Sequence, residues 1–534
     1  MTIHAYAAAA LLLWSPHVGS VGQVPGAADA AVRQRASVAP RHVLAQLSAL
    51  MDEGELSRAR TLVEQALRRY PSDAALHNIA GAIDAQQGAY GAAERHFQAA
   101  IRADRHLAGA YVNLGRLYQE HAKEDPAAPR KALAVYRELL SVDPANTEAL
   151  FQAAYLSACA GDWASSRVRL DRLPIDVRSR PQALAVLAVD LAGLADHIRA
   201  AEVAREIIRH PGLTEQDLLA VIPALERAKD DVLSELLFAG LDERHLASAG
   251  SLRQLGIVNM RLGRLGRARE VLERAFSDGG APVPLLVDLA RVAYKQRDFE
   301  GALGYLAHAR DLDPNNAEVH FMFGIACVEL NLGAEAYDAL KKAVALAPGN
   351  AYVNYAMGAV AIHRHDPSDA LPYFEKYVRL KPDDPRGRFA LGAARFYSND
   401  LNAARLDLRQ ATRSADTAAG AHYFLARIAR QANDIETARQ EIERALQANP
   451  RYADALAEVG WIETRRGEFE AAERSLQQAL AIDPDNYAAT FNLAALYART
   501  RDPRADEQKT KLEALQAKRA AAAQEFLRII QVVQ

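Results

Sequence analysis

The chain has 534 residues, of which 50% are apolar and 25% are charged, and its 64 basic and 67 acidic residues leave a formal charge of -3. This composition favours packed helices over sheet or disorder, and the balanced charge argues against a nucleic-acid-binding surface. The only cysteines, Cys159 and Cys327, stand alone in separate helical segments, which excludes a disulfide framework and a thiolate metal site.

The first thirty residues differ from the rest of the chain. The apolar run AYAAAALLLW is too short to span a bilayer, and an Ala-x-Ala pattern follows at Ala28 and Ala30. We therefore expect a secretory signal peptide at residues 1–30 and an exported protein, periplasmic or secreted, from a bacterium. Because no lysine or arginine precedes Arg33, the alternative is a disordered or wrongly assigned N-terminus on a cytoplasmic protein. No later apolar run is long enough for a membrane span.

Residues 40–173 carry small and aromatic residues at helical spacing, and they predict a first array of helical hairpins. The residues that mark it are Ala59, Ala66, Pro71, Gly88, Tyr90, Ala93, Phe97, Ala100, Gly161 and Trp163. In residues 174–248 the regularly spaced small and aromatic residues become sparse, and Ala201 is one that remains. We interpret this zone as divergent helical repeats at a bend between two arrays.

Residues 249–486 form seven consecutive repeats of 34 residues. A small residue recurs at Gly256, Ala290, Gly324, Gly358, Gly392, Ala426 and Gly460, and again at Ala494. Twelve positions after the small residue stand Ala268, Ala302, Ala336, Ala370, Ala404, Ala438 and Ala472, and four further on stand Leu272, Leu306, Leu340, Phe374, Leu408, Ile442 and Leu476. Five repeats end in proline, at Pro314, Pro348, Pro382, Pro450 and Pro484, and in four of these cases Asn316, Asn350, Asp384 or Asn486 follows.

Each column has a mechanical reason. A small residue within a first helix allows a second helix to lie close against it, and the large apolar residues fill the interior. Proline stops the preceding helix, while the Asn or Asp behind it can accept the free amides of the next one. One such hairpin cannot bury its apolar face alone, so neighbouring hairpins must stack.

These columns resemble the tetratricopeptide repeat, whose signature has Leu-Gly, an aromatic, two alanines and a proline at this period. VNLGRLYQE and FNLAALYART match its first half closely, around Leu114 and Leu493. The resemblance implies an all-α solenoid, a right-handed superhelix of stacked helical hairpins. Residues 487–534 then hold a last helical unit and a mixed-charge helix that caps the array.

No motif of an enzyme is evident. His363, His365 and Asp366 lie close in sequence, but they fall at a turn between helices, where a solvated turn explains them better than a metal site. Phosphate-binding loops and hydrolase signatures do not occur. We therefore expect no catalytic residue, no cofactor and no metal.

The resemblance implies that the chain binds a protein or an extended peptide in a concave groove lined by the first helices. The fifth position of these helices carries Phe321, Tyr355, Phe389, Tyr423 and Phe491, with Ala457 interrupting the series. Two interpretations stay open: the rings pack in the core, or they form a ladder that stacks on a peptide. Asn113 and Asn492 occupy sixth positions, but the Lys and Arg set required to hold a peptide's C-terminal carboxylate is missing around them.

The sequence thus predicts a non-catalytic interaction scaffold or adaptor. The alternative is a targeting subunit of an O-linked N-acetylglucosamine transferase-like or polysaccharide-export system, with the catalytic part on another chain. The repeats resemble the corresponding region of such transferases, but they and the cap occupy the chain to its last residues.

Overall fold

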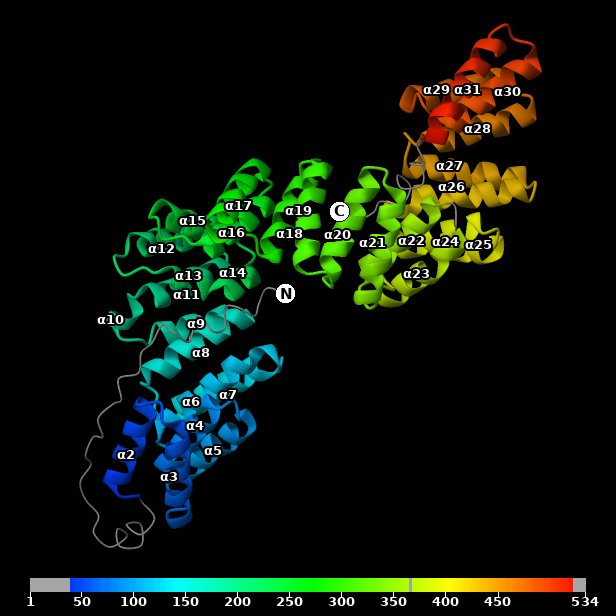
Figure 1. Ribbon diagram of the computed structural model, residues 1–534. Helices are drawn as coiled ribbons and strands as arrows, with labels where there is room; N and C mark the ends of the chain where they lie inside the picture. The colour runs from blue at the N-terminus through cyan, green and yellow to red at the C-terminus, as the bar shows by residue number, and fades with distance from the viewer. Residues whose placement is uncertain (1–38, 365–366, 522–534) are drawn as a thin grey trace. The chain divides into compact units, whose positions relative to one another are not determined.

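The computed structural model describes residues 39–364 and 367–521. In these residues the chain forms thirty α-helices, one short 3-10 helix and no β-strand (Figure 1). The predicted all-α class is therefore confirmed. By its contacts the chain divides into two compact units, Met1–Gly280 and Ala281–Gln534.

Within its described residues, the first unit contains the sixteen α-helices from α2 to α17 and the 3-10 helix η2. Its helices are α2 (Arg41–Asp52), α3 (Leu56–Arg69), α4 (Ala74–Gln86), α5 (Tyr90–Ala103), α6 (Ala108–Glu120), η2 (His121–Lys123), α7 (Ala128–Val142), α8 (Thr147–Ala160), α9 (Trp163–Leu170), α10 (Ile175–Arg178), α11 (Pro181–Gly193), α12 (His197–Arg209), α13 (Glu215–Leu219), α14 (Ile222–Ala228), α15 (Asp231–Glu243), α16 (Ala249–Arg261) and α17 (Leu265–Gly279).

The second unit contains the helices from α18 onward. They are α18 (Val283–Lys295), α19 (Phe299–Leu312), α20 (Ala317–Glu329), α21 (Gly333–Leu346), α22 (Ala351–His363), α23 (Pro367–Leu380), α24 (Pro385–Tyr397), α25 (Leu401–Ala411), α26 (Ala415–Gln431), α27 (Ile435–Ala448), α28 (Ala453–Arg466), α29 (Phe469–Ile482), α30 (Tyr487–Thr500) and α31 (Ala505–Ala521).

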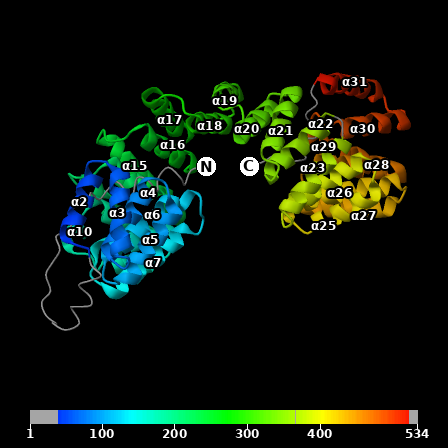
Figure 2. The ribbon, with the colours of Figure 1, turned by 60° about the horizontal axis from the view of Figure 1, so that its bottom comes forward.

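Within each unit, consecutive helices pack as hairpins, and each hairpin packs on the next. First helices also contact one another directly, as α22 does with α24 and α24 with α26. Figure 2 shows this stacking for α26, α27, α28 and α29. The predicted stacking of helical hairpins is confirmed, while the repeat boundaries at residues 173, 248 and 486 stay predictions.

The glycine column has the steric role that its spacing predicts. A Cβ added at Gly256, Gly324 or Gly460 would lie 2.5, 2.6 or 2.5 Å from the nearest atom of the leucine sixteen residues later. At Gly358 that neighbour is Phe374, 2.8 Å away. Real Cβ atoms essentially never make contacts this short, so at these four repeats the second helix can lie this close only because the first helix carries glycine there.

The polar residues behind the prolines cap the following helices, as expected. The side chain of Asn316 accepts from the amides of Glu318 and Val319, and Asn486 accepts from the amide of Ala489. Each cap satisfies amides that the first helical turn leaves without partners. Helix starts in the second unit are therefore encoded locally.

The zone predicted as divergent is irregular. It contains the three short helices α10, α13 and α14. Several large apolar side chains in and beside this zone are exposed, namely Val168, Ile175, Leu194, Ile198 and Val232. In contrast, α11 is buried almost all round and includes one carboxyl group, that of Asp190, at 0% exposure.

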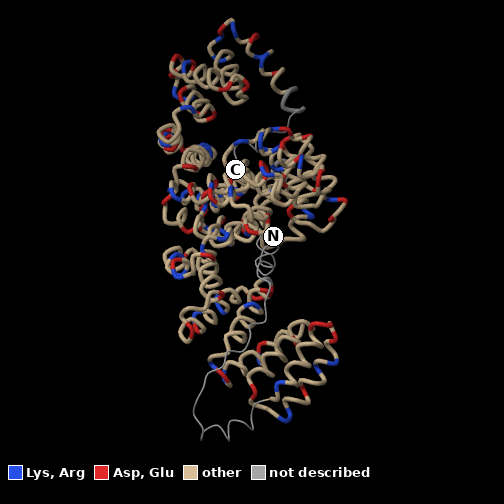
Figure 3. Tube along the Cα trace, turned by 90° about the vertical axis from the view of Figure 1, so that its left-hand side faces the viewer, with Lys and Arg blue, Asp and Glu red and all other residues tan. Residues whose placement is uncertain are grey.

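Basic and acidic residues alternate along both units rather than gathering by sign (Figure 3). Many form pairs within a hairpin or between hairpins, as Arg274 does with Asp242 at 2.7 Å. None of the described helices combines the length and apolar character that crossing a membrane requires. The predicted signal peptide, His365 and Asp366 lie outside the described residues.

Candidate functional site

Three of the predicted rings lie in the core of the second unit. Tyr355, Phe389 and Tyr423 are only 4%, 7% and 8% exposed. The Tyr355 ring packs against Tyr377 with its centroid 4.9 Å away, and Tyr423 packs against Tyr452 at 5.2 Å. The Phe389 ring packs against Phe424 of α26, with its centroid 5.9 Å away. Burial thus favours the packing interpretation at these three positions.

The remaining predicted residues have more varied surroundings. Phe321 is half-buried, and Phe491 is 50% exposed on α30. The Asn113 Nδ2 group donates to Asn78 Oδ1 at 3.0 Å, and Asn492 Nδ2 donates to the carbonyl oxygen of Ala457 at 3.0 Å. Both asparagines therefore connect neighbouring first helices. The structure does not bring the seven residues together as one exposed ladder, and their peptide-binding role stays a prediction.

A different group of side chains lies on three successive first helices, α24, α26 and α28. We call it the arginine–aromatic face, and it consists of Tyr397, Arg427, Arg430, Trp461 and Arg465. Tyr397 is 38% exposed, Arg427, Arg430 and Trp461 are half-buried, and Arg465 is exposed. The face thus combines aromatic surface with cationic groups that solvent can reach.

The guanidinium group of Arg427 is the centre of this face. Its carbon lies 4.7 Å from the ring centroid of Phe396 and 5.7 to 5.9 Å from the centroids of Tyr423, Phe424 and Tyr397. Such distances are within the range of cation–π attraction. Arg427 is therefore held by rings from both its own helix and α24.

A second arginine on the same helix face makes a fixed ion pair. Arg430 Nη1 donates to both carboxylate oxygens of Glu458, at 3.0 and 2.9 Å. Burial raises the pKa of Glu458, and Arg430 opposes that shift. The guanidinium groups of Arg430 and Arg465 lie 4.7 and 5.3 Å from the Trp461 ring centroid. Two cations thus lie within cation–π distance of the Trp461 ring.

The sequence indicates this face at the ninth position of the first helices, and not at the fifth position used above. At the ninth position of the same helices, the repeats from 317 onward have Ile325, Ala359, Ala393, Arg427, Trp461 and Ala495. Two large polar or aromatic residues in successive repeats stand out against small and aliphatic neighbours. The ring cluster around Arg427, however, depends on contacts between helices that periodicity does not describe.

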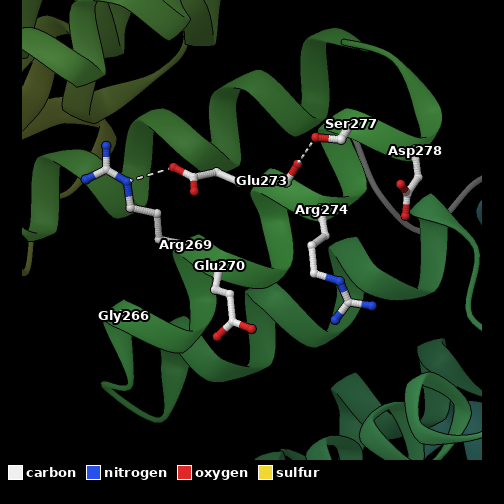
Figure 4. A pocket seen from close by; sticks show the side chains of 7 residues that line it. All are labelled: Gly266, Arg269, Glu270, Glu273, Arg274, Ser277 and Asp278. Atoms are coloured by element: carbon white, nitrogen blue, oxygen red, sulfur yellow. Dashed lines mark hydrogen bonds and ion pairs between the residues drawn. The ribbon is translucent and has the colours of Figure 1, made fainter.

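Two cavities in the first unit are less suited to a function. One, of about 460 Å³, lies along α17 and is lined by Gly266, Arg269, Glu270, Glu273, Arg274, Ser277 and Asp278 (Figure 4). Its arginines are paired with carboxylates, as Arg269 Nε donates to Glu273 Oε1 at 3.0 Å and Arg274 pairs with Asp242. The other, of about 420 Å³, lies between α3, α4 and α5 around Asp84. Arg60 pairs with that carboxylate at 2.8 Å.

No three His, Cys, Asp or Glu side chains come together in a way that could hold a metal ion within the described parts of the chain.

Two family models described as Tetratricopeptide repeat match the sequence. One matches residues 293–360, and the other matches residues 44–108, 389–453 and 460–529. No curated protein matches the chain closely enough to count as a relative.

Several solved structures are similar at low identity. The Cut9–Hcn1 hetero-tetramer of the APC/C is 15% identical with a TM-score of 0.39, covering 85% of this chain and 89% of that one. Yeast Tom70 is 16% identical with a TM-score of 0.32, covering 82% and 99%. PilF of Pseudomonas aeruginosa is 22% identical with a TM-score of 0.34, covering 38% and 92%. Likenesses of this size say nothing about what the chain binds.

Proposed function

Because the chain belongs to the tetratricopeptide repeat family, we propose that it is a non-catalytic scaffold that binds an extended segment of another polypeptide. The arginine–aromatic face is its binding surface. The protein works after export, with residues 1–30 removed as a signal peptide. Each of these statements has its own test.

One observation carries the proposal, namely the gathering of Tyr397, Arg427 and Trp461 on neighbouring first helices. Trp, Tyr and Arg are the residue types that contribute most to protein–protein binding energy. They offer large contact area with few rotatable bonds, and they retain polar groups for orientation. The half-buried state of Trp461 and Arg427 means that much of their ordering cost is already met in the free chain.

The face extends across several repeats, as an extended ligand requires. Exposed or half-buried rings stand on α24 at Tyr397, on α28 at Trp461 and on α30 at Phe491. A polypeptide that crosses the first helices would meet these rings in turn. In an extended polypeptide, every second side chain points to the same side and could contact these rings. Such binding requires no catalytic group on the chain.

A random-peptide phage library panned on the purified full chain tests the proposal. We expect selected peptides to bind Trp461→Ala and Tyr397→Ala variants at least about tenfold more weakly, since hot-spot residues contribute about 2 kcal/mol or more. The matched control is Leu406→Ala, which removes an exposed apolar side chain from the second helix α25. Thermal melting should verify that all three variants are folded.

Two results would refute this function. One is a failure to select any peptide above background. The other is selection of peptides that bind Trp461→Ala and Tyr397→Ala as tightly as the original chain.

A further inference from the structure

Arg427 has an unusual electrostatic environment. Its guanidinium group is half-buried among four rings, and no ion pair joins it to a carboxylate within the described residues. The ring faces attract the cation, and the Tyr397 side chain makes a hydrogen bond with Arg427. A single phenol oxygen cannot accept the planar pair of N–H bonds that a guanidinium group offers to a carboxylate. This leaves strong donor capacity on a solvent-accessible face.

The carboxylate that acts on Arg427 is itself paired with another arginine. Glu458 is bound through both of its oxygens to Arg430, and it acts on Arg427 only through space. Arg430 lies one helical turn from Arg427 on α26 and adds a positive charge to the same face. Arg465 on α28 adds a third. A bound anion near Arg427 would therefore meet a net positive field.

We propose that Arg427 is an anion subsite that receives the side-chain carboxylate of an Asp or Glu within the bound polypeptide. This inference rests on the proposed function and specifies the class of segment: an acidic residue flanked by apolar or aromatic ones. A bidentate guanidinium–carboxylate pair next to rings is stronger and more directional than an exposed pair. The flanking residues contact Tyr397 on one side and Trp461 on the other.

The position of Arg427 argues for an internal acidic residue and not for a chain end. It stands on α26, between the rings of α24 and those of α28 and α30, so a ligand can continue in both directions. A terminal carboxylate would end the ligand at the middle of this series. Contacts on the far side of Arg427 would then be lost.

Two phage libraries of random decapeptides without free C-termini test this subsite, one with a fixed central Glu and one with a fixed central Gln. We expect the full chain to enrich the Glu library at least about tenfold over the Gln library, in line with charge-assisted hydrogen bonds. Arg427→Gln should abolish the preference, and Arg427→Lys should restore only part of it because the planar fork is lost. Arg409→Gln makes the same charge change on α25, where Arg409 is exposed, and should keep the preference.

The outcomes separate this inference from the proposed function. Equal enrichment of both libraries, or a Glu preference that survives Arg427→Gln in a folded variant, overturns the subsite while peptide binding stands. Binding of synthetic central-Gln peptides that requires their free C-terminal carboxylate also overturns it, because the subsite would then hold a chain end and not an internal acidic side chain. If neither library is enriched, both proposals fail.

Discussion

Gly460 and Leu476 face each other so closely that a Cβ on residue 460 would lie 2.5 Å from Leu476 Cγ. The same glycine–leucine relationship recurs at Gly324 with Leu340 and at Gly392 with Leu408, and Gly358 faces Phe374 in the repeat between them. It explains why small residues are spaced so regularly in an otherwise ordinary helical sequence.

Gly460→Ala should therefore destabilise the second unit. Alanine normally favours a helix by up to about 1 kcal/mol over glycine, but here the methyl group must displace Leu476, and overpacking costs about 1 to 3 kcal/mol. Urea unfolding measures the net loss. Gly304→Ala is the control, because no atom lies within 4 Å of a Cβ built there. If both variants shift stability in the same direction, the close contact is not limiting.

The buried rings should behave differently from the exposed one. Phe389→Ala is expected to lower the free energy of unfolding by about 3 to 5 kcal/mol, since it leaves a cavity between α24 and α26. Phe491→Ala removes a half-exposed ring and should cost less than about 1 kcal/mol. Chemical denaturation of the two variants compares them directly. Similar costs at both positions would mean that exposure does not distinguish these rings.

The residues that could be predicted from the sequence are those that repeat. Gly460, Leu476 and Asn486 each stand at a position where similar residues recur in other repeats. A steric or capping argument made for one repeat therefore predicts the helix contacts and helix starts of the others. Helix type, hairpin stacking and the caps followed from these columns. The all-α class needed no long-range information.

The residues that could not be predicted depend on contacts between helices. Arg427 acquires its ring environment because Phe396 and Tyr397 on α24 lie beside it, and no period encodes that neighbourhood. Likewise the fifth-position rings look identical in sequence, yet Tyr423 meets Tyr452 across a loop while Phe491 remains exposed. Periodicity predicts which face of a helix a side chain lies on, but packing against neighbouring helices determines whether that side chain is exposed.

Asp190 should make the first unit sensitive to pH. Burial raises the pKa of this carboxyl to about 8, and the nearby Ser166 and Arg167 oppose that shift only in part. The groups that act on it are Ser166, Arg167 and Asp162 around α9 and the nearby Cys159 thiol of α8. The folded chain thus binds a proton that the unfolded chain releases.

The sign of the effect follows from that difference. The contribution of Asp190 to stability should be most favourable below about pH 4, where an unfolded Asp is protonated too, and should become less favourable until about pH 8, where the folded carboxyl ionises. Asp190→Asn should flatten this slope and raise stability at pH 7 by about 1 kcal/mol or more, because each pKa unit corresponds to about 1.4 kcal/mol. Urea unfolding at several pH values measures it, with exposed Asp52→Asn on α2 as control. An unchanged slope in Asp190→Asn would contradict the assignment.

Export predicts a processed N-terminus. Intact-mass analysis of the native protein from its own cells should find a chain that begins near Ala31, because the Ala-x-Ala pattern ends at Ala30. Fractionation of the cell envelope supplies the second readout. Recovery of the chain with Met1 or Thr2 from the cytoplasm would contradict export.

Helix α31 should protect the end of the second unit. Gln508 is buried on it, and Gln516 Nε2 donates to the Tyr487 hydroxyl of α30 at 3.1 Å. A chain that ends after Arg504 would expose the apolar side of α30, where Leu493 and Leu496 are buried. Terminal repeats of such arrays need a polar outer cover to stay ordered and soluble.

After this truncation, hydrogen exchange should show a loss of amide protection in α30 and a smaller loss in α28 and α29. The reason is that each stacked repeat is stabilised by its contacts with the adjacent repeats. Amides of α20 and α21 are the internal control and should keep their protection, because several hairpins separate them from the cut. Light scattering would reveal the accompanying self-association. If α30 exchanges as slowly in the truncated chain as in the full one, α31 is a tail that contributes nothing to the order of the unit.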